Sequence, residues 1–526
     1  MLAQSAIDNY LDAPRDSHVW IKTLSEKQLD RALAEQGFRT ICPETPLKKH
    51  QKACVLLCLA YPCFSLWLDM GTGKTRIILE LLAHYWRTKQ IRKALVLGVS
   101  EAGVDAWVEQ IDRWGFPVPY LALGNMSSEA KWAQIAEEWD KGVLLCSYPG
   151  LSWLLSKRVV EPKKKARQKK DKKLIQRFSA GLDAFVPDES TKLGRHDSLI
   201  SRAAKDLSKE CAFRYALAGR PFGKDPTMVW NQQYTIDRGE SLGDTLGLFR
   251  AAFFSEKKGY FGGYEYTFKK SMEEKLAEVM GHRSISYSAD ECLSLPEVSR
   301  MKEMVSFPED IQSYFDKAVK ALRAAKGDRI KIKNIFLRMR QMSSGFLGYK
   351  DDETGARAEL VFPHNPKLDH LLALVEEVPL DRKWVVFHDF VHSGKFIMEE
   401  LRRRKITAGW LRSGADVKKE LQGFNSNNKV RGLVASWHMA GMSVNLQKSN
   451  YVFFFESPVG IIDREQAERR CFRQGQQHKG FMYDLVVRGS MDESILNFHK
   501  KGEDLFQALV RNPNSVIDDC GTKTLS

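Results

Sequence analysis

The stretch LWLDMGTGKTRIIL, residues 66–79, places a short glycine-rich loop between a buried apolar run and an amphipathic run. In a strand–loop–helix arrangement of this kind, successive backbone N–H groups point at a phosphate, and the positive end of the helix adds to the attraction. Lys74 is then expected to reach the β- and γ-phosphates of a nucleotide, and the Thr75 hydroxyl is expected to hold Mg²⁺. The predicted phosphate-binding loop comprises Gly71, Thr72, Gly73, Lys74 and Thr75.

The same alternation of apolar and amphipathic runs recurs along the chain. KALVLGVS at 93–100 precedes GVDAWVEQIDRW, and WVVFHDF at 384–390 precedes KFIMEELRRR. Strands that alternate with helices indicate a parallel sheet covered by helices on both faces. Between about 238 and 370 the pattern becomes helical and rich in aromatic and basic residues. We therefore expect two parallel α/β domains with a mainly helical region between them.

These changes of pattern set the expected domain boundaries. An N-terminal segment covers residues 1–45, the first α/β domain 46–237, the mainly helical region 238–370, the second α/β domain 371–510 and a tail 511–526. The first domain contains a basic insertion at 157–177.

The charge of the chain indicates a polyanion as its partner. The formal net charge is +15, and residues 157–177 alone hold eleven Lys/Arg and two Asp/Glu. A solvated insertion or a nuclear-targeting signal has a similar composition, and a phosphate-binding arm is the third interpretation. In that third interpretation the phosphate contacts are Lys163, Lys164, Lys165, Lys169 and Lys170.

Neither a membrane-spanning segment nor a secretory signal is evident in the sequence. No run of about 18 apolar residues occurs, and the N-terminal MLAQSAIDNYLDAPRDS lacks the basic-then-apolar order of a signal peptide. We expect no membrane partner. We expect a cytoplasmic location, associated with the nucleoid in a bacterial or virus-infected cell, or a nuclear location in a eukaryotic cell.

The nine cysteines, an odd number spread over 526 residues, indicate a reduced interior. Cys54, Cys58 and Cys63 are close enough in sequence to suggest a metal site. No fourth ligand follows at the spacing of zinc sites. We therefore expect buried core thiols.

A phosphate-binding loop also needs carboxylates, and Asp188-Glu189 at the end of LDAFVP provides a pair. Asp188 is expected to bind Mg²⁺ through water, and Glu189 is expected to take the proton from the attacking water. Pro187 is unexpected in a central strand because it removes a ladder donor, unless it is the last residue of the strand.

A second basic pattern is QAERRCFRQGQ, residues 466–476. On a helix Arg470 and Arg473 lie three residues apart on one face, with Gln466 one turn earlier. An arginine pair at this spacing is usually only an exposed face. In two-domain motors, however, an arginine supplied by the other domain can accelerate hydrolysis by about 10³ to 10⁵. We predict this catalytic role for Arg470 and Arg473.

Taken in order, the motifs LKKHQ, LDMGTGKT, DEST, ALAGRP, SVNLQ and QAERRCFRQGQ resemble the motif series of the superfamily-two helicase-like ATPases. Within that superfamily they are most similar to the Snf-type family, which includes the chromatin remodellers. The similarity extends over residues 46–510, and the chain resembles the compact viral or bacterial members. The family's closing signature is met at Gln466, Ala467, Arg470, Arg473, Gly475 and Gln476.

The resemblance implies an α/β fold of two RecA-like lobes in tandem, with ATP and Mg²⁺ bound between them. It also implies that Gln51 recognises adenine and that Gly441 and Gln466 contact the nucleotide. Contacts with nucleic acid are implied at Ser100, Trp107, Ser147, Tyr148, Ser443 and Asn445.

Two residues depart from the family pattern. Thr191 stands where many relatives have histidine, and Arg220 stands where threonine is usual. Both lie in elements that couple the nucleotide state to the grip on DNA. We therefore expect the coupling, rather than hydrolysis itself, to be unusual.

The implied function is a DNA-dependent ATPase that translocates on double-stranded DNA and displaces or remodels bound protein. Two alternatives stay open. One is a strand-separating DNA or RNA helicase on the same scaffold, and the other is an ATP-gated nucleic-acid-binding protein that moves nothing. Lys74, Glu189 and Arg473 are all present, which argues against the last alternative.

Overall fold

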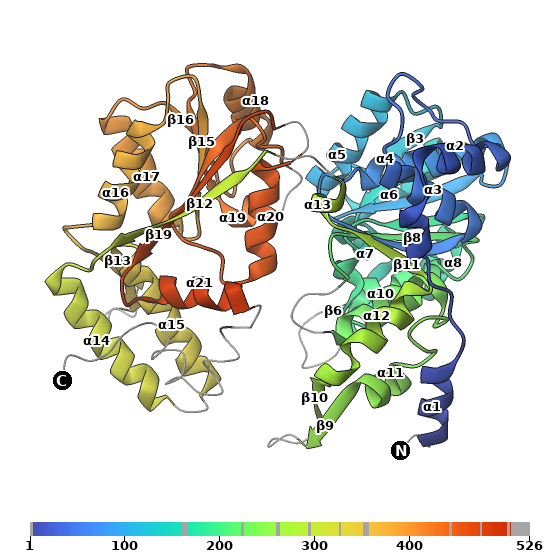
Figure 1. Ribbon diagram of the computed structural model, residues 1–526, viewed down its shortest axis with the longest axis horizontal. Coiled ribbons are helices and arrows are strands. Elements are labelled where there is room, and N and C mark those ends of the chain that lie inside the picture. The colour runs from blue at the N-terminus through green and yellow to red at the C-terminus, as the bar shows by residue number, and fades with distance from the viewer. Residues whose placement is uncertain are drawn as a thin grey trace. The chain divides into compact units, whose positions relative to one another are not determined.

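The chain divides into two compact units, unit 1 (Met1–Leu293) and unit 2 (Ser294–Ser526) (Figure 1). The computed structural model describes residues 4–159, 167–221, 226–258, 264–292, 296–325, 328–350, 357–440, 444–473, 476–501 and 505.

Unit 1 is built on a parallel sheet of seven strands in the order β11-β1-β8-β7-β2-β4-β3. Its strands are β1 (Cys63–Leu68), β2 (Lys93–Gly98), β3 (Tyr120–Ala122), β4 (Gly142–Ser147), β7 (Ala184–Pro187), β8 (Phe213–Ala218) and β11 (Ser284–Tyr287). Two antiparallel hairpins are separate from this sheet: β5 (Ser156–Val159) with β6 (Arg167–Lys170), and β9 (Phe254–Lys258) with β10 (Tyr264–Phe268).

Helices cover both faces of this sheet. Alternate residues of β2 enter two different hydrophobic clusters: Ala94 and Val96 pack in one, and Leu95 and Leu97 pack in the other. This period of two is what a strand buried on both faces requires. The helices of unit 1 are α1 (Gln4–Asp12), η1 (Val19–Thr23), α2 (Glu26–Glu35), α3 (Lys49–Ala60), α4 (Lys74–Arg87), α5 (Glu101–Trp114), α6 (Ser128–Glu138), α7 (Tyr148–Leu154), α8 (Lys172–Ser179), η2 (Ser190–Leu193), α9 (Leu199–Leu207), α10 (Thr227–Asp237), α11 (Leu246–Phe253), η3 (Lys270–Met272), α12 (Glu273–Gly281) and α13 (Ala289–Cys292).

Unit 2 repeats this design with six parallel strands in the order β12-β19-β18-β15-β17-β16. Along β15, Trp384 and Val386 pack in one cluster, and Val385 and Phe387 pack in the other. The strands are β12 (Val298–Val305), β15 (Lys383–His388), β16 (Ala408–Leu411), β17 (Gly432–Ser436), β18 (Ser449–Phe454) and β19 (Gly480–Val487), with a hairpin of β13 (Phe346–Lys350) and β14 (Arg357–Val361). The helices are α14 (Glu309–Ala324), α15 (Arg329–Ser343), α16 (Pro366–Glu377), α17 (Val391–Arg403), α18 (Val417–Ser426), α19 (Trp437–Ala440), α20 (Ile461–Cys471) and α21 (Met491–Lys501).

The prediction of two parallel α/β sheets is confirmed. The region predicted as mainly helical, 238–370, is instead shared between the units, because β11 pairs with β1 and β12 pairs with β19. These strands lie at the edges of their sheets. β11 has four residues, and the apolar residues of β12 are interrupted by the polar pairs Ser299-Arg300 and Lys302-Glu303. Neither strand therefore shows the continuous apolar run by which central parallel strands are identified.

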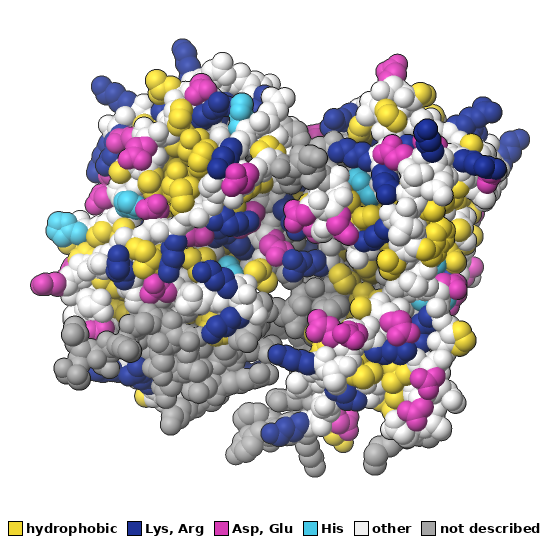
Figure 2. All heavy atoms as spheres, viewed as in Figure 1, with side chains coloured by type: hydrophobic (Ala, Val, Ile, Leu, Met, Phe, Trp, Pro, Cys, Tyr) yellow, Lys and Arg dark blue, Asp and Glu magenta, His cyan; other side chains and the backbone are white. Residues whose placement is uncertain are grey.

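The surface carries charges of both signs. On the face shown in Figure 2, Lys and Arg side chains are interspersed with Asp and Glu side chains. Across the described ranges, no helix combines the length and the apolar character needed to cross a membrane.

Cys54 and Cys58 are fully buried in a hydrophobic cluster of unit 1, as predicted for core thiols. Burial raises the pKa of both thiols far above the ordinary value, so both are protonated. Cys63 is only half-buried. Within the described residues, no group of three or more His, Cys, Asp or Glu side chains is arranged to hold a metal ion.

Helix α4, which follows the glycine-rich loop, is held to the preceding N-terminal segment by Glu80. This fully buried carboxylate lies 2.6 Å from the Arg76 guanidinium. It also accepts hydrogen bonds from the Thr40 hydroxyl at 2.5 Å and from the Ile41 backbone N–H at 2.8 Å.

We predict that Glu80→Ala lowers the free energy of unfolding by about 3–5 kcal/mol, because it leaves the buried Arg76 without its carboxylate. Arg31 and Glu35 provide a matched control, since they form a similar i,i+4 pair whose side chains are 81% and 63% exposed. Glu35→Ala should cost far less because water already screens that pair. Urea unfolding of the full chain measures both changes, and equal losses of stability would contradict the prediction.

Candidate active site

The predicted phosphate-binding loop joins the carboxyl end of β1 to the first residue of α4. Gly71 and Gly73 have φ values of 84° and 91°, in the left-handed region that glycine adopts without strain. A Cβ atom at Gly73 would lie 2.1 Å from Nε2 of Gln51, so a side chain there would displace the Gln51 carboxamide. The Lys74 ammonium donates to the Leu68 carbonyl at 2.7 Å, which places it over the loop.

Two buried side chains of α3 hold this loop by the same backbone carbonyl. Gln51 donates from Nε2 to the Thr72 carbonyl at 3.0 Å, and His50 Nε2 lies 2.7 Å from the same oxygen. Because a carbonyl only accepts, the imidazole must carry its proton on Nε2. Burial lowers the pKa of His50, which favours the neutral ring. The contact from His50 was not anticipated, and recognition of adenine by Gln51 stays a prediction.

The acidic pair follows β7, which is separated from β1 in the sheet by β8 alone. Pro187 is the last residue of β7, opposite Leu97 of β2, so its missing N–H falls at the strand end. The Asp188 N–H then donates to the Leu97 carbonyl at 2.9 Å. The carboxyl ends of parallel strands lie at one edge of a sheet, and so the acidic pair and the glycine-rich loop face the same edge.

The Asp188 carboxylate is held from two sides. The indole of Trp107 donates from Nε1 to Oδ2 at 3.0 Å, and the backbone N–H of Glu189 donates to Oδ1 at 2.9 Å. Burial and the neighbouring Glu189 carboxylate raise the pKa of Asp188 to about 6, while the positive charge of Lys74 and the Trp107 hydrogen bond oppose that rise. Mg²⁺ prefers hard oxygen ligands and would add positive charge here. The Asp188 carboxylate and the Thr75 hydroxyl are the groups we expect to hold it.

Glu189 has a backbone conformation that is unusual for a residue with a side chain. Its φ and ψ are 48° and 54°, in the left-handed region. Such a conformation costs about 1–3 kcal/mol and persists only where the surroundings impose it. Directly after it, the buried Ser190 hydroxyl donates to Oε1 of Gln232 in α10 at 3.1 Å. Backbone strain of this kind clusters at functional sites, which fits the predicted role of Glu189 as the base.

Three residues predicted to contact nucleic acid prove to be internal. Trp107, Ser147 and Tyr148 are 2%, 1% and 5% exposed. The Tyr148 hydroxyl donates to the Asp188 carbonyl at 2.9 Å, and the Ser147 hydroxyl donates to the Glu101 carboxylate at 2.7 Å. Because these side chains have almost no exposed surface, we correct their expected role from contacting nucleic acid to supporting the acidic loop and α7.

Outside the basic insertion, Ser100 and Asn445 are the other predicted nucleic-acid contacts among the described residues. Ser100 is half-buried at the start of α5, where its hydroxyl accepts from the Gly103 N–H at 3.4 Å. Asn445 is exposed, and its side-chain oxygen accepts from the Gln447 N–H at 3.2 Å. Their contacts with nucleic acid stay predictions. Gly441 and Ser443 lie outside the described residues.

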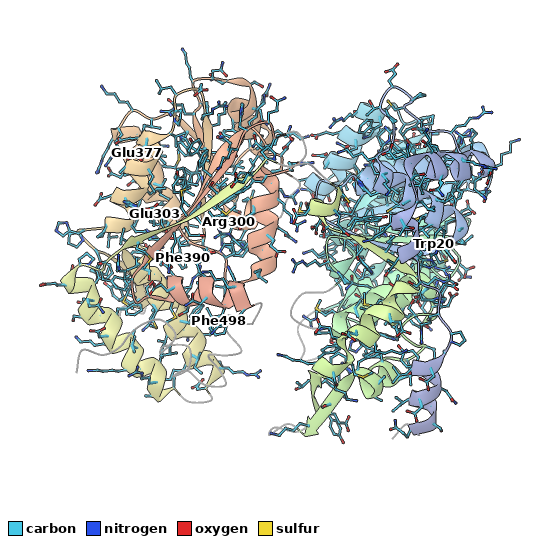
Figure 3. All side chains as sticks on the ribbon, viewed as in Figure 1. Trp20, Arg300, Glu303, Glu377, Phe390 and Phe498 are labelled. Atoms are coloured by element: carbon cyan, nitrogen blue, oxygen red, sulfur yellow. The ribbon has the colours of Figure 1, made fainter. Side chains whose placement is uncertain are left out.

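In unit 2, helix α20 carries the predicted Gln466 and Arg470, and Arg473 follows two residues after its end. The helix is fixed to its own sheet by Arg464, which donates to the Asp484 carboxylate of β19 and lies 2.7 Å from Glu468. Glu468 in turn lies 2.7 Å from Arg300. Figure 3 labels Arg300, which belongs to β12.

Arg470 is 9% exposed, and Gln466 and Arg473 are half-buried. The action of Arg470 and Arg473 on the nucleotide stays a prediction, as does the contact from Gln466.

The basic insertion forms the hairpin of β5 and β6 and the start of α8. Lys169 is exposed on β6, directly opposite Lys157 of β5. Lys170 lies 2.5 Å from the Asp206 carboxylate, which also lies 3.3 Å from Lys209, so Lys170 already has an ion-pair partner within the protein. Lys163, Lys164 and Lys165 lie outside the described residues.

A cluster in unit 2 was not anticipated from the sequence. The Asp389 carboxylate, just beyond β15, lies 2.7 Å from Arg340 and 3.0 Å from Nε2 of His438. The hydrogen bond to Asp389 raises the pKa of His438. Residues 340, 389 and 438 are widely separated in sequence, and no local pattern indicates that they meet.

Comparison with known proteins shows what this chain is similar to. Residues 65–235 match the SNF2-related domain. An uncharacterized ATP-dependent helicase of Mycoplasma genitalium is 21% identical over 85% of this chain and 40% of its own length. Protein p41 of Acyrthosiphon pisum secondary endosymbiont phage 1 is 21% identical over 82% of this chain and 91% of its own length. The chromodomain-helicase-DNA-binding protein 1 of Gallus gallus is 23% identical over 82% of this chain.

This chain spans 40% of the Mycoplasma protein and 24% of the Gallus gallus protein. Among solved structures, the Sulfolobus solfataricus SWI2/SNF2 ATPase core in complex with dsDNA is 17% identical, covers 92% of this chain and 95% of its own, and has a TM-score of 0.38. The domain match bears out the resemblance to the Snf-type ATPases over residues 65–235.

We predict that Trp107→Phe raises the Mg²⁺ concentration for half-maximal ATP hydrolysis by about tenfold or more. Phenylalanine keeps the packing but removes the donor that orients and stabilises the Asp188 carboxylate, and losing such a supporting hydrogen bond typically weakens metal affinity or activity about 10- to 100-fold. Trp114→Phe is the control, because Trp114 lies on the same helix and its indole donates to Gln110 at 3.0 Å. A Mg²⁺ titration that shifts equally in both variants would contradict a specific role for Trp107.

Proposed function

We propose that this chain, which carries an SNF2-related domain at residues 65–235, is a DNA-dependent ATPase that translocates on double-stranded DNA and displaces or remodels bound protein. The observation that carries the proposal is the half-site in unit 1, by which we mean the groups of unit 1 that are suited to bind ATP. There the glycine-rich loop, Lys74 and the Asp188-Glu189 pair all follow parallel strands, and the pKa of Asp188 responds to the charge of Lys74.

Each part of this half-site suits one step of phosphoryl transfer to water. The loop N–H groups and Lys74 bind and neutralise the phosphates, and Thr75 and Asp188 are suited to hold Mg²⁺. Glu189 is then suited to accept the proton of the attacking water. Without water activation the loop would only bind nucleotide, and for this reason we assign hydrolysis rather than a passive nucleotide switch.

Duplex DNA as the partner is supported by charge and by relatives. The chain has a net charge of +15, concentrated in the basic insertion at 157–177. The Gallus gallus relative is named as a DNA-binding protein, and a 28% identical relative from Drosophila willistoni, aligned over 28% of this chain, is named as a DNA repair and recombination protein. Contacts to phosphate are independent of sequence, which is what movement along DNA requires.

Strand separation is the second candidate function. The Mycoplasma relative is named as a helicase, and the two functions use the same scaffold. They differ in whether the duplex is opened, so nucleic-acid substrates can separate them.

We predict that duplex DNA stimulates ATP hydrolysis more than single-stranded DNA or duplex RNA, and that the chain displaces the third strand of a triplex without unwinding a forked duplex. Glu189→Gln should still bind ATP but hydrolyse it about 10² to 10⁴ times more slowly, because it lacks the base. Forked-duplex unwinding would favour the second candidate. If wild type resembles Glu189→Gln with every nucleic acid, the proposed function is wrong.

We also propose that the basic insertion at 157–177 is a phosphate-binding arm. Replacing Lys163, Lys164, Lys165 and Lys169 by Gln should weaken DNA binding and reduce the slope of log affinity against log salt by about 0.9 for each lysine that contacts phosphate. ATP binding should be unchanged. Lys170→Gln is the control and should alter the slope less, because Lys170 is held in an ion pair with Asp206. A salt slope equal to that of wild type would contradict this proposal and would favour the interpretation of residues 157–177 as a solvated insertion.

A further inference from the structure

Gln232 of α10 lies between the loop after β7 and the loop after β8 and forms hydrogen bonds with both. It is 1% exposed. Its Oε1 accepts from the Ser190 hydroxyl at 3.1 Å. Its Nε2 donates to the Pro221 carbonyl at 2.7 Å and to the Met228 carbonyl of its own helix at 3.1 Å. One carboxamide therefore bridges the loop after β7 and the loop after β8.

The two loops have different predicted roles. Ser190 directly follows Glu189, the predicted base, whose left-handed backbone must be held in place by its surroundings. Pro221 follows Arg220 in the loop after β8, where the resemblance implies coupling to DNA. The strands β7 and β8 are neighbours in the sheet, so a single side chain is long enough to reach both loops.

The bridge is directional, and this makes Gln232 hard to replace. The Pro221 carbonyl can only accept, so it takes the N–H of Gln232, and the Ser190 hydroxyl then faces Oε1 and donates to it. A carboxamide offers both on one rigid group, whereas a carboxylate offers only acceptors and an alkyl side chain offers neither.

The neighbouring Asn231 strengthens the same attachment. Its Nδ2 donates to the Leu193 carbonyl at the end of η2, at 2.5 Å, and the Ser201 hydroxyl donates to the same oxygen at 3.0 Å. Both ends of η2 are thus fixed to buried side chains. A displacement of the Pro221 loop would therefore act on Glu189 through Gln232 rather than be absorbed by a loose segment.

We propose that Gln232 is a positioning residue that ties the Glu189 carboxylate to the loop after β8, so that the state of that loop sets the rate of DNA-stimulated hydrolysis. The inference rests on the proposed function, because it assigns a route for stimulation by DNA. It adds a residue outside the motifs by which the family resemblance was identified.

The decisive variant is Gln232→Glu. Glutamate has nearly the same size as glutamine and keeps an oxygen that accepts from Ser190. It replaces the N–H donor that faces the Pro221 carbonyl with a second oxygen acceptor. Above neutral pH the carboxylate repels the Pro221 carbonyl, and kcat of DNA-stimulated hydrolysis should fall about 10- to 100-fold, the scale expected for a misplaced catalytic group. The KM for ATP should stay unchanged because the glycine-rich loop is untouched.

Lowering the pH should rescue this variant. Burial raises the pKa of the introduced carboxyl, and once protonated its O–H can donate to Pro221. The ratio of kcat in Gln232→Glu to kcat in wild type should therefore rise as the pH falls. Ser190→Ala removes the other arm and should lower kcat without this pH-dependent recovery.

Gln233→Glu is the matched control. Gln233 is the next residue, is fully buried, and likewise bridges a serine hydroxyl and an acceptor: it accepts from Ser65 at 2.8 Å and donates to Asp237 at 2.8 Å. It has no recorded contact with the acidic loop among the described residues. Thermal unfolding of each variant at each pH separates lost stability from lost positioning.

Two outcomes would overturn the inference: kcat and KM of Gln232→Glu equal to wild type at every pH, or the same pH-dependent loss of kcat in Gln233→Glu. Failure of the proposed function looks different, because wild type itself would then show no stimulation by DNA.

Discussion

Parallel pairing of β1, β8, β7 and β2 is the constraint on which the rest of the site depends. Parallel strands present all their carboxyl ends at one edge, so the loops that follow these strands must converge. The glycine-rich loop follows β1, the acidic pair follows β7, and the Arg220-Pro221 loop follows β8. The sheet order, rather than the order along the chain, decides that the glycine-rich loop after β1 and the loop after β8 are neighbours.

Electrostatics explains why so many supporting groups are buried beside the acidic loop. Two adjacent carboxylates repel each other, and burial further disfavours their charge, so the pKa of Asp188 rises. The hydrogen bond from the Trp107 indole and the positive charge of Lys74 both lower the pKa of Asp188. A nucleotide site that must hold Mg²⁺ needs Asp188 ionised, which is why a donor such as Trp107 is better placed inside the unit than on its surface.

The sequence predicts the parts of the site that are local and misses those that are not. GTGKT and Asp188-Glu189 are identified because each lies within a few residues of a strand that its apolar run reveals. The hydrogen bond from Trp107 to Asp188 joins residues 81 positions apart, and the bridge made by Gln232 joins three segments. Family resemblance placed Trp107 near nucleic acid, and only its burial showed otherwise. Edge strands β11 and β12 were missed because their polar or short runs resemble loops and helices.

The two departures from the family pattern can be understood through the same bridge. Gln232 binds the carbonyl of Pro221, and a carbonyl is present whatever side chain stands at position 220. Its other arm is bonded to Ser190, one residue before the unusual Thr191, whose own hydroxyl reaches back only to the Glu189 carbonyl at 3.4 Å. A link made through backbone and Ser190 does not require histidine at 191 or threonine at 220. The arrangement therefore lets both positions vary while Glu189 stays tied to the neighbouring loop.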